Sequence, residues 1–269
     1  MSFRIEDLNL SNIDDLIYVC SKDKLQNPVH RKGIEIKKKW LRRILREVGP
    51  IAKIAYFNNE PVAQILYYPE EIIPALEFKR KQVICIHCIY NSRIKAQKRG
   101  IGKSLLRSLL EESQKPMKIL NGKPCRFIIA KSFDTGEFLP LPEFYKRMGF
   151  KQGIESSMWG GKIMYLEITD KYEPLPPIEE YKPLKEDRER VIVFYSPICQ
   201  FSYQFAYIAS RTIKEIVPSV EVRMINKWEK PDEFIKRKGN WLIVNAKPIK
   251  SSPLEKDRFV SEVIEALGF

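Results

Sequence analysis

Residues 97–106 read QKRGIGKSLL, a short basic loop with two closely spaced glycines that runs directly into a leucine-rich stretch. The β-branched residues 82–90 before it predict a strand, and leucines at helical spacing predict a helix over residues 101–113. Glycines at such a junction let the backbone approach a ligand closely. The first N–H groups of a helix lack intrahelical partners, and the helix dipole places partial positive charge there. The junction therefore predicts an anion site suited to a pyrophosphate.

The spacing of this loop excludes two better-known phosphate-binding motifs. No glycine lies five residues before Gly102, as the G-x-x-x-x-G-K-S/T loop requires, and Leu105 stands where G-x-G-x-x-G needs a third glycine. The loop fits the shorter pattern Q/R-x-x-G-x-G/A. A second segment, residues 144–150 (FYKRMGF), follows a predicted strand at 125–130 and ends a further predicted helix.

In these two motifs, and in the elements between them, the chain resembles the GNAT acetyltransferases over residues 1 to about 170. The resemblance implies an α/β (α+β) fold with a splayed, mixed, mostly antiparallel sheet that holds acetyl-CoA as the acetyl donor. It also implies direct attack of a primary amine on the thioester. Tyr145 matches the family's tyrosine that protonates the departing thiolate, and packing in the core is its alternative role.

The resemblance implies a set of cofactor contacts along the predicted strand and loop. The strand contributes backbone groups, and the loop contributes backbone and charge. The set is Cys88, Ile89, Tyr90, Gln97, Lys98, Arg99, Gly100, Ile101, Gly102, Lys103 and Ser104. Residues 91–96 depart from the family pattern, because this loop is longer and lacks the common proline.

The general base that deprotonates the acceptor is a separate question. His87 lies on the predicted strand, and a side chain of this type suits the role of a base near neutral pH, although a hydrogen-bonded core histidine is the favoured interpretation. Glu70 and Glu71 end a neighbouring predicted strand and are the other candidates.

A proline-rich, charged segment at 172–188 predicts a linker between domains at 1–171 and 189–269. The second domain reads β-α-β-α-β-β-α and resembles the thioredoxin fold, with Cys199 at the start of a predicted helix. Ser202 replaces the second cysteine of the C-x-x-C motif, and the usual cis-proline is absent. These departures argue against a dithiol oxidoreductase and leave monothiol chemistry, partner binding or a structural role for Cys199. The domain pair resembles the YoaP-type acetyltransferases.

Composition sets the remaining expectations. The 269 residues carry a net charge of +13, of which residues 1–170 hold +11, so the anionic partner belongs to the first domain. The basic residues 31–46 predict the solvated face of an amphipathic helix. Nucleic-acid binding is disfavoured, because no motif of a known nucleic-acid-binding module accompanies these residues. An odd count of five cysteines predicts reduced thiols and a cytoplasmic location. The Cys85–Cys88 run reads as a strand, so we expect no metal site.

The leading hypothesis is thus an acetyl-CoA-dependent N-acetyltransferase acting on an amine of a small molecule or protein. The alternative is a thiol, redox or partner-binding protein that acts through Cys199, with the first domain sensing acyl-CoA. No stretch is apolar enough to predict a membrane span. A homodimer is left open, and the acceptor cannot be named from the sequence.

Overall fold

The computed structural model describes residues 3–132, 139–156 and 161–268. The chain divides into two compact units. Unit 1 contains residues 1–24, 41–73 and 78–176, and unit 2 contains residues 25–40, 74–77 and 177–269. Two short segments from the N-terminal half of the chain therefore belong to unit 2.

Unit 1 is built on a seven-stranded sheet with the order β1-β2-β3-β4-β5-β7-β6. Every neighbouring pair is antiparallel except β4 and β5, which are parallel. The strands are β1 (Phe3–Asp7), β2 (Ala52–Phe57), β3 (Glu60–Pro69), β4 (Val83–Asn91), β5 (Phe127–Ser132), β6 (Lys151–Ser156) and β7 (Lys162–Glu167). The predicted mixed, mostly antiparallel sheet of an α/β chain is confirmed.

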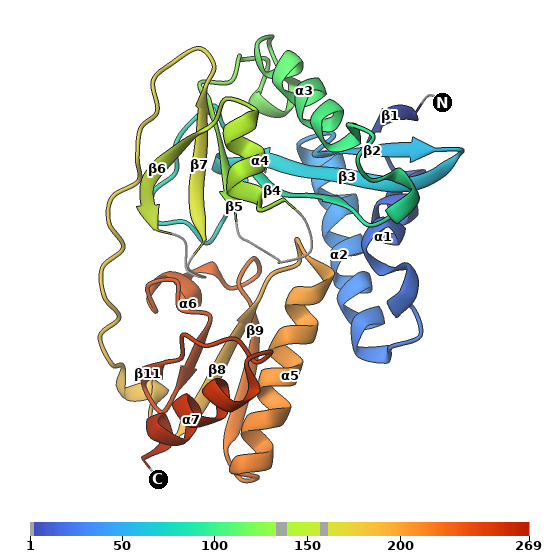
Figure 1. Ribbon diagram of the computed structural model, residues 1–269. Coiled ribbons are helices and arrows are strands. Elements are labelled where there is room, and N and C mark those ends of the chain that lie inside the picture. Colours follow the sequence, from blue (N-terminus) through green and yellow to red (C-terminus); the bar gives the residue numbers. More distant parts are fainter. Residues whose placement is uncertain (1–2, 133–138, 157–160, 269) are drawn as a thin grey trace. The chain divides into compact units, whose positions relative to one another are not determined.

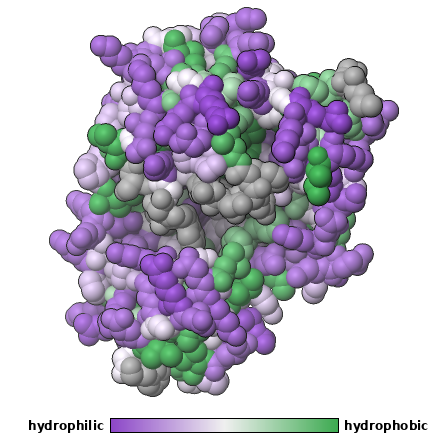
Figure 2. Space-filling model, in the orientation of Figure 1, coloured by the Kyte–Doolittle hydropathy of each residue, from purple (hydrophilic) through white to green (hydrophobic). Residues whose placement is uncertain are grey.

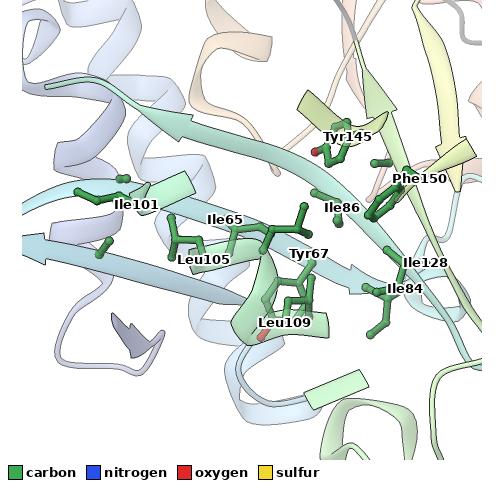
Figure 3. Close-up of a cluster of buried hydrophobic side chains, with 14 of the residues drawn as sticks. Ile65, Tyr67, Ile84, Ile86, Ile101, Leu105, Leu109, Ile128, Tyr145 and Phe150 are labelled. Carbon is green, nitrogen blue, oxygen red and sulfur yellow. The ribbon is translucent and has the colours of Figure 1, made fainter. Parts of the chain in front are cut away.

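Helices cover both faces of this sheet. Helices α3 (Ile101–Ser113) and α4 (Leu141–Arg147) pack on one face, and α1 (Ile13–Ser21) packs on the other (Figure 1). Side chains on successive strand residues point to opposite faces, so each strand supplies both layers. The core under α3 and α4 includes Ile65, Tyr67, Ile86 and Leu105 (Figure 3). Short 3-10 helices occur at Lys22–Lys24, Glu70–Ile72, Ile94–Ala96 and Lys118–Leu120.

Unit 2 contains a four-stranded sheet with the order β11-β10-β8-β9. Strands β8 and β9 are parallel, and β10 is antiparallel to both of its neighbours. The elements are the 3-10 helix Lys185–Asp187, β8 (Arg190–Tyr195), α5 (Gln200–Ile216), β9 (Glu221–Asn226), α6 (Pro231–Ile235), β10 (Leu242–Val244), β11 (Lys247–Pro248) and α7 (Lys256–Leu267). Helices α5 and α7 pack with Val191 and Val193 of β8, whereas α6 packs with Ile192 and Phe194 on the other face.

Helix α2 (Pro28–Glu47) is the basic amphipathic helix predicted around residues 31–46. Its N-terminal part belongs to unit 2, and its last residues belong to unit 1. Within unit 2, a Cβ on Gly33 would lie 2.1 Å from the carbonyl oxygen of Gln200, so only glycine allows this close approach to the start of α5. The Lys37 ammonium, which is only 2% exposed, donates to Gln200 Oε1 at 3.0 Å.

Most predicted elements are present, with two local errors. The helix predicted over 101–113 has those bounds, but β6 has no counterpart in the prediction. Ser11, which precedes the apolar residues of α1, is of a type that favours an N-cap and is predicted to cap this helix; instead Asn12 is the N-cap residue, and the Ser11 hydroxyl donates to Asn9 Oδ1. Among the described residues, no helix combines the length and apolar character needed to cross a bilayer. The face drawn in Figure 2 is largely hydrophilic, with scattered hydrophobic side chains.

Candidate functional site

The candidate site lies where strand β4 diverges from its parallel neighbour β5. The parallel pairing of these strands runs from Val83 opposite Phe127 to Ile86 opposite Ala130 and ends there. Beyond Ile86, β4 continues to Asn91 but pairs, among the described residues, only with β3. The strand therefore presents a row of backbone N–H and C=O groups on its other side, next to Cys88, Ile89 and Tyr90. Such an edge can bind an extended ligand through main-chain hydrogen bonds.

A β-bulge marks the same point on the β3 side. The register shifts so that Leu66 faces Cys88 while Tyr67 faces Ile86, and His87 is the extra residue. The half-buried His87 ring lies with its Nδ1 atom 3.3 Å from the Tyr68 hydroxyl. The bulge turns His87 out of the regular alternation of β4. The structure thus places His87 beside the point where β4 and β5 part, already in contact with a buried tyrosine.

The loop after β4 delivers the chain to the N-terminus of α3. Gly100 is the N-cap residue and has φ +76°, in the left-handed region that favours glycine. Ser104 N donates to Gly100 O at 3.0 Å, which is the first hydrogen bond of the helix. The N–H groups before it have no intrahelical acceptor. Helix α3 is long enough for its dipole to favour an anion at this end.

The loop residues predicted to contact the cofactor differ in solvent exposure. Lys98, Arg99, Gly100 and Lys103 are exposed, and Gln97, Gly102 and Ser104 are half-buried. Ile101 is a buried core residue, so only its backbone can serve a ligand. Arg99 is already engaged: its Nε donates to Lys95 O at 2.8 Å, and its guanidinium lies 4.9 Å from the centre of the Phe57 ring. Lys98 and Lys103 are therefore the charges best placed for an anion.

The side chain of Tyr145, a residue of α4, lies in the core between Phe144 and Phe150, with ring centroids 5.5 and 5.1 Å away. It is 0% exposed, and its hydroxyl has no hydrogen-bond partner among the described residues. Burial, together with the neighbouring Cys88, raises the pKa of this phenol well above its ordinary value. Figure 3 shows Tyr145 beside Ile86, the last β4 residue paired to β5. A buried hydroxyl with no partner calls for an explanation, and a ligand atom that enters between the two strands would provide one.

Glu70 is unsuited to act as the general base that was considered for it. It is 0% exposed and accepts hydrogen bonds from the Arg80 backbone N–H at 2.8 Å and from Arg80 Nη2 at 2.6 Å. Removing a proton from an acceptor would break this buried ion pair. Glu71 accepts a hydrogen bond from the Gln82 backbone N–H at 3.1 Å, which is a strand-end contact.

Cys199 belongs to unit 2, whereas the other candidate residues belong to unit 1. It is half-buried at the N-cap of α5, and Ser202 N donates to its carbonyl oxygen at 3.0 Å. The Ser202 hydroxyl accepts a hydrogen bond from Ser196 N at 2.8 Å. None of the five cysteines forms a disulfide, and no group of three His, Cys, Asp or Glu side chains within the described ranges could hold a metal ion.

Sequence reasoning missed Gln64 of β3 and two residues that directly follow β4, Ser92 and Arg93. The Gln64 amide, 1% exposed, contacts Cys20 Sγ at 2.9 Å through Nε2, while its Oε1 has no hydrogen-bond partner in the described structure. Ser92 and Arg93, at the end of β4, also carry buried polar atoms without hydrogen-bond partners there. No motif marks these residues, because their surroundings come from α1 and β3, which are distant in the sequence.

Several solved structures are similar to this chain. PaiA N-acetyltransferase from Thermoplasma acidophilum, solved with coenzyme A, is 15% identical; the match covers 62% of this chain and 99% of that one, with a TM-score of 0.43. The loading GNATL domain of CurA from Lyngbya majuscula is 14% identical over 62% and 98%, with a TM-score of 0.44. An N-acetyltransferase from Staphylococcus aureus Mu50 is 13% identical over 62% and 99%, with a TM-score of 0.42.

No protein-family sequence model and no curated protein matches the chain. With TM-scores below 0.5, the likenesses to solved structures assign neither a family nor an activity to it.

Proposed function

We propose that unit 1 is an acetyl-CoA-dependent N-acetyltransferase of the GNAT type. The observation that carries the proposal is the parting of β4 from β5 directly after Ile86. It leaves one open strand edge next to the buried, unpartnered Tyr145 hydroxyl, and the loop after β4 leads from it to the N-terminus of α3. A pantetheine arm is an extended chain with amide groups, and it matches the strand edge. A pyrophosphate matches the helix N-terminus.

The residues support a direct transfer. The amine nitrogen of the acceptor attacks the thioester carbonyl carbon, and the resulting tetrahedral intermediate collapses with cleavage of the carbon–sulfur bond. Tyr145 donates its phenolic proton to the departing thiolate, and the amine proton goes to a base, for which His87 is the candidate. Burial raises the pKa of Tyr145, so the phenol is in its protonated form across the physiological range.

Release of free thiol from acetyl-CoA in the presence of a panel of primary amines tests this activity. Tyr145→Phe should lower kcat about 100-fold or more and leave the KM for acetyl-CoA within about twofold. The fold should not lose stability, because the hydroxyl that is removed makes no hydrogen bond in the described structure. Tyr67→Phe, another buried tyrosine of the same core, is the matched control and should keep its turnover. Unchanged turnover of Tyr145→Phe would remove the acid role, and a folded protein that releases no thiol with any amine would contradict the proposed activity.

We also propose that unit 2 is a thioredoxin-like module. Its strand order, with parallel β8 and β9 at one side and antiparallel β10 and β11 at the other, supports this assignment, as does the position of Cys199 at the start of α5. We assign it a structural or partner-binding role. Cys199→Ser should therefore leave acetyl transfer unchanged in the assay above, and loss of transfer would make the thiol part of the activity.

A further inference from the structure

The end of β4 concentrates buried hydrogen-bond donors that have no acceptor. Ser92 Oγ, Arg93 Nε and Arg93 Nη2 are all buried, and none has a hydrogen-bond partner within the described structure. The Arg93 side chain is only 11% exposed. Most buried polar groups in proteins are hydrogen-bonded, and a buried guanidinium is costly unless an anion faces it. The unfilled donors therefore indicate a place for an anionic group.

The charges around Arg93 do not balance. Glu60 is the carboxylate nearest to three cations, with Lys95 Nζ at 2.6 Å, Lys22 Nζ at 3.6 Å and Arg93 Nε at 3.7 Å. Only Lys95 is close enough for a hydrogen bond, and that bond is the largest cause of the lowered pKa of Glu60. One carboxylate thus faces three positive charges, and the two that it does not hydrogen-bond are Lys22 and Arg93.

Tyr18 of α1 connects this charge to the α1 face of the sheet, near Cys88 of β4. The Arg93 guanidinium lies 5.0 Å and the Lys22 ammonium 5.7 Å from the centre of the Tyr18 ring. Two residues further along α1, Cys20 contacts Gln64, whose amide is also 3.8 Å from Cys88 Sγ. Arg93 therefore lies against Tyr18 of α1, and Cys88 lies near Gln64, which contacts Cys20 of the same helix.

We propose that Arg93, with Lys22, binds an anionic group of the amine acceptor, so that the substrate class is a primary amine that also carries a carboxylate or a phosphate. This inference rests on the proposed acetyltransferase function. Five residues separate Cys88 from Arg93, and at the rise of a strand they span at most roughly 16 Å. With the amine at the level of Cys88, beside the open edge of β4, the anionic group lies at most roughly 16 Å from it.

The phosphates of the acetyl donor are a second source of the same chemistry. Lys98 and Lys103 at the N-terminus of α3 already offer exposed positive charge for those phosphates, whereas Arg93 lies over Tyr18 of α1. We therefore assign the anionic group to the acceptor. The effect of Arg93→Gln on the Kd for acetyl-CoA distinguishes this assignment from binding of the donor phosphates.

The test compares kcat/KM for linear ω-amino carboxylates of about eight and eleven carbons with kcat/KM for their neutral primary amides, measured by thiol release. A charge-assisted hydrogen bond corresponds to a preference for the carboxylate of about 10- to 100-fold. Arg93→Gln should abolish this preference and leave the Kd for acetyl-CoA within about twofold. Lys95→Gln, which removes an exposed cation bonded to the same Glu60, should retain the preference.

The Arg93→Gln protein should fold, because Nε and Nη2 make no hydrogen bond to the described residues. Arg93→Lys, which keeps the charge without the planar fork, should lose only part of the preference and serves as the second variant. Wild-type protein that transfers acetyl groups equally to both members of each pair, or Arg93→Gln that keeps the preference, would overturn the inference. Weaker acetyl-CoA binding by Arg93→Gln without a carboxylate preference would assign the anion to the donor instead. Absence of acetyl-CoA binding by the folded wild type would overturn the proposed function and this inference with it.

Discussion

Burial raises the pKa values of two thiols in unit 1. Desolvation raises the pKa of Cys125 to about 12, and it raises the pKa of Cys85 well above its ordinary value. A thiol whose pKa is higher in the folded protein than in the unfolded chain stabilises the fold below the unfolded pKa, and that contribution is lost as the pH rises. Unfolding exposes both groups, so the unfolding free energy should fall above about pH 8.5.

For Cys125 alone we expect a loss of about 2 kcal/mol between pH 8 and pH 10. Chemical denaturation of the wild type and of Cys125→Ala at several pH values measures it. The substitution removes buried volume and lowers stability at every pH, but it should flatten the decline above pH 8.5. Two curves with the same slope would show that Cys125 titrates alike in the folded and unfolded chain.

The side chains of the candidate site differ in how far the sequence could predict them. Tyr145 and Gly100 were predicted from motifs, because short local patterns fix a helix N-terminus and a helix-ending aromatic pair. The base role considered for Glu70 is disfavoured by its buried pairing with Arg80, and that pairing depends on the chain folding back over ten residues. Arg93 was not predicted at all, since its unfilled donors follow from packing against Tyr18.

Among the elements, the contact between α2 and the start of α5 depends on one glycine. Gly33→Ala would place a methyl group 2.1 Å from the Gln200 carbonyl oxygen, and neither backbone can yield without moving a helix. We expect the melting temperature to fall, with a cost of about 1–3 kcal/mol. Gly102→Ala is the matched control: its Cβ would be 3.9 Å from Phe144, and alanine favours a helix by about 1 kcal/mol. Thermal unfolding of the two variants measures the difference. Equal melting temperatures would contradict the close approach of Gly33 to the Gln200 carbonyl oxygen.

Periodicity predicted the elements whose pattern is strong and failed where the pattern is weak. Helix α3 has the predicted bounds because Leu105, Leu106 and Leu109 form a continuous buried stripe. Strand β6 was missed because its sequence, KQGIES, has one large apolar residue, Ile154, which is 85% exposed. This strand is held by pairing with β7, and a single-sequence pattern does not record such pairing.

At the scale of the molecule, each unit contains one buried arginine–carboxylate pair among the described residues. Arg80 pairs with Glu70 in unit 1, and in unit 2 Arg237, 1% exposed, donates from Nε to Asp187 Oδ2 at 3.0 Å. Glu70→Gln should cost about 3–5 kcal/mol, because the buried Arg80 guanidinium loses its counter-charge. Asp187→Asn should cost less, because Glu233 and Glu186 remain paired with Arg237. Calorimetric unfolding with and without acetyl-CoA measures both effects.

The two variants should differ in how they affect the unit that binds acetyl-CoA. Asp187→Asn should keep the Kd for acetyl-CoA within about twofold at temperatures where the protein is folded, since the proposed site belongs to unit 1. Glu70→Gln should lower the stability of the unit that acetyl-CoA protects. Loss of acetyl-CoA binding in folded Asp187→Asn would show that the donor site needs unit 2.

The grouping of residues 25–40 and 74–77 with unit 2 could not be predicted from the sequence. The proline-rich stretch after residue 171 is a local signal, and it is visible in a single sequence. The fit of Gly33 against Gln200 joins residues far apart in the chain, and neither residue carries a pattern that names the other.

Calorimetric titration of acetyl-CoA into wild type, Gly100→Glu and Gly122→Glu tests the central claim most directly. Both glycines have positive φ, +76° and +74°, and open space where a Cβ would lie, so the two substitutions impose the same backbone strain. Only Gly100 caps the helix where the pyrophosphate is proposed to bind. We expect stoichiometric micromolar binding by wild type and Gly122→Glu, and none by Gly100→Glu. Equal binding by both variants, or none by folded wild type, would contradict the proposed donor site.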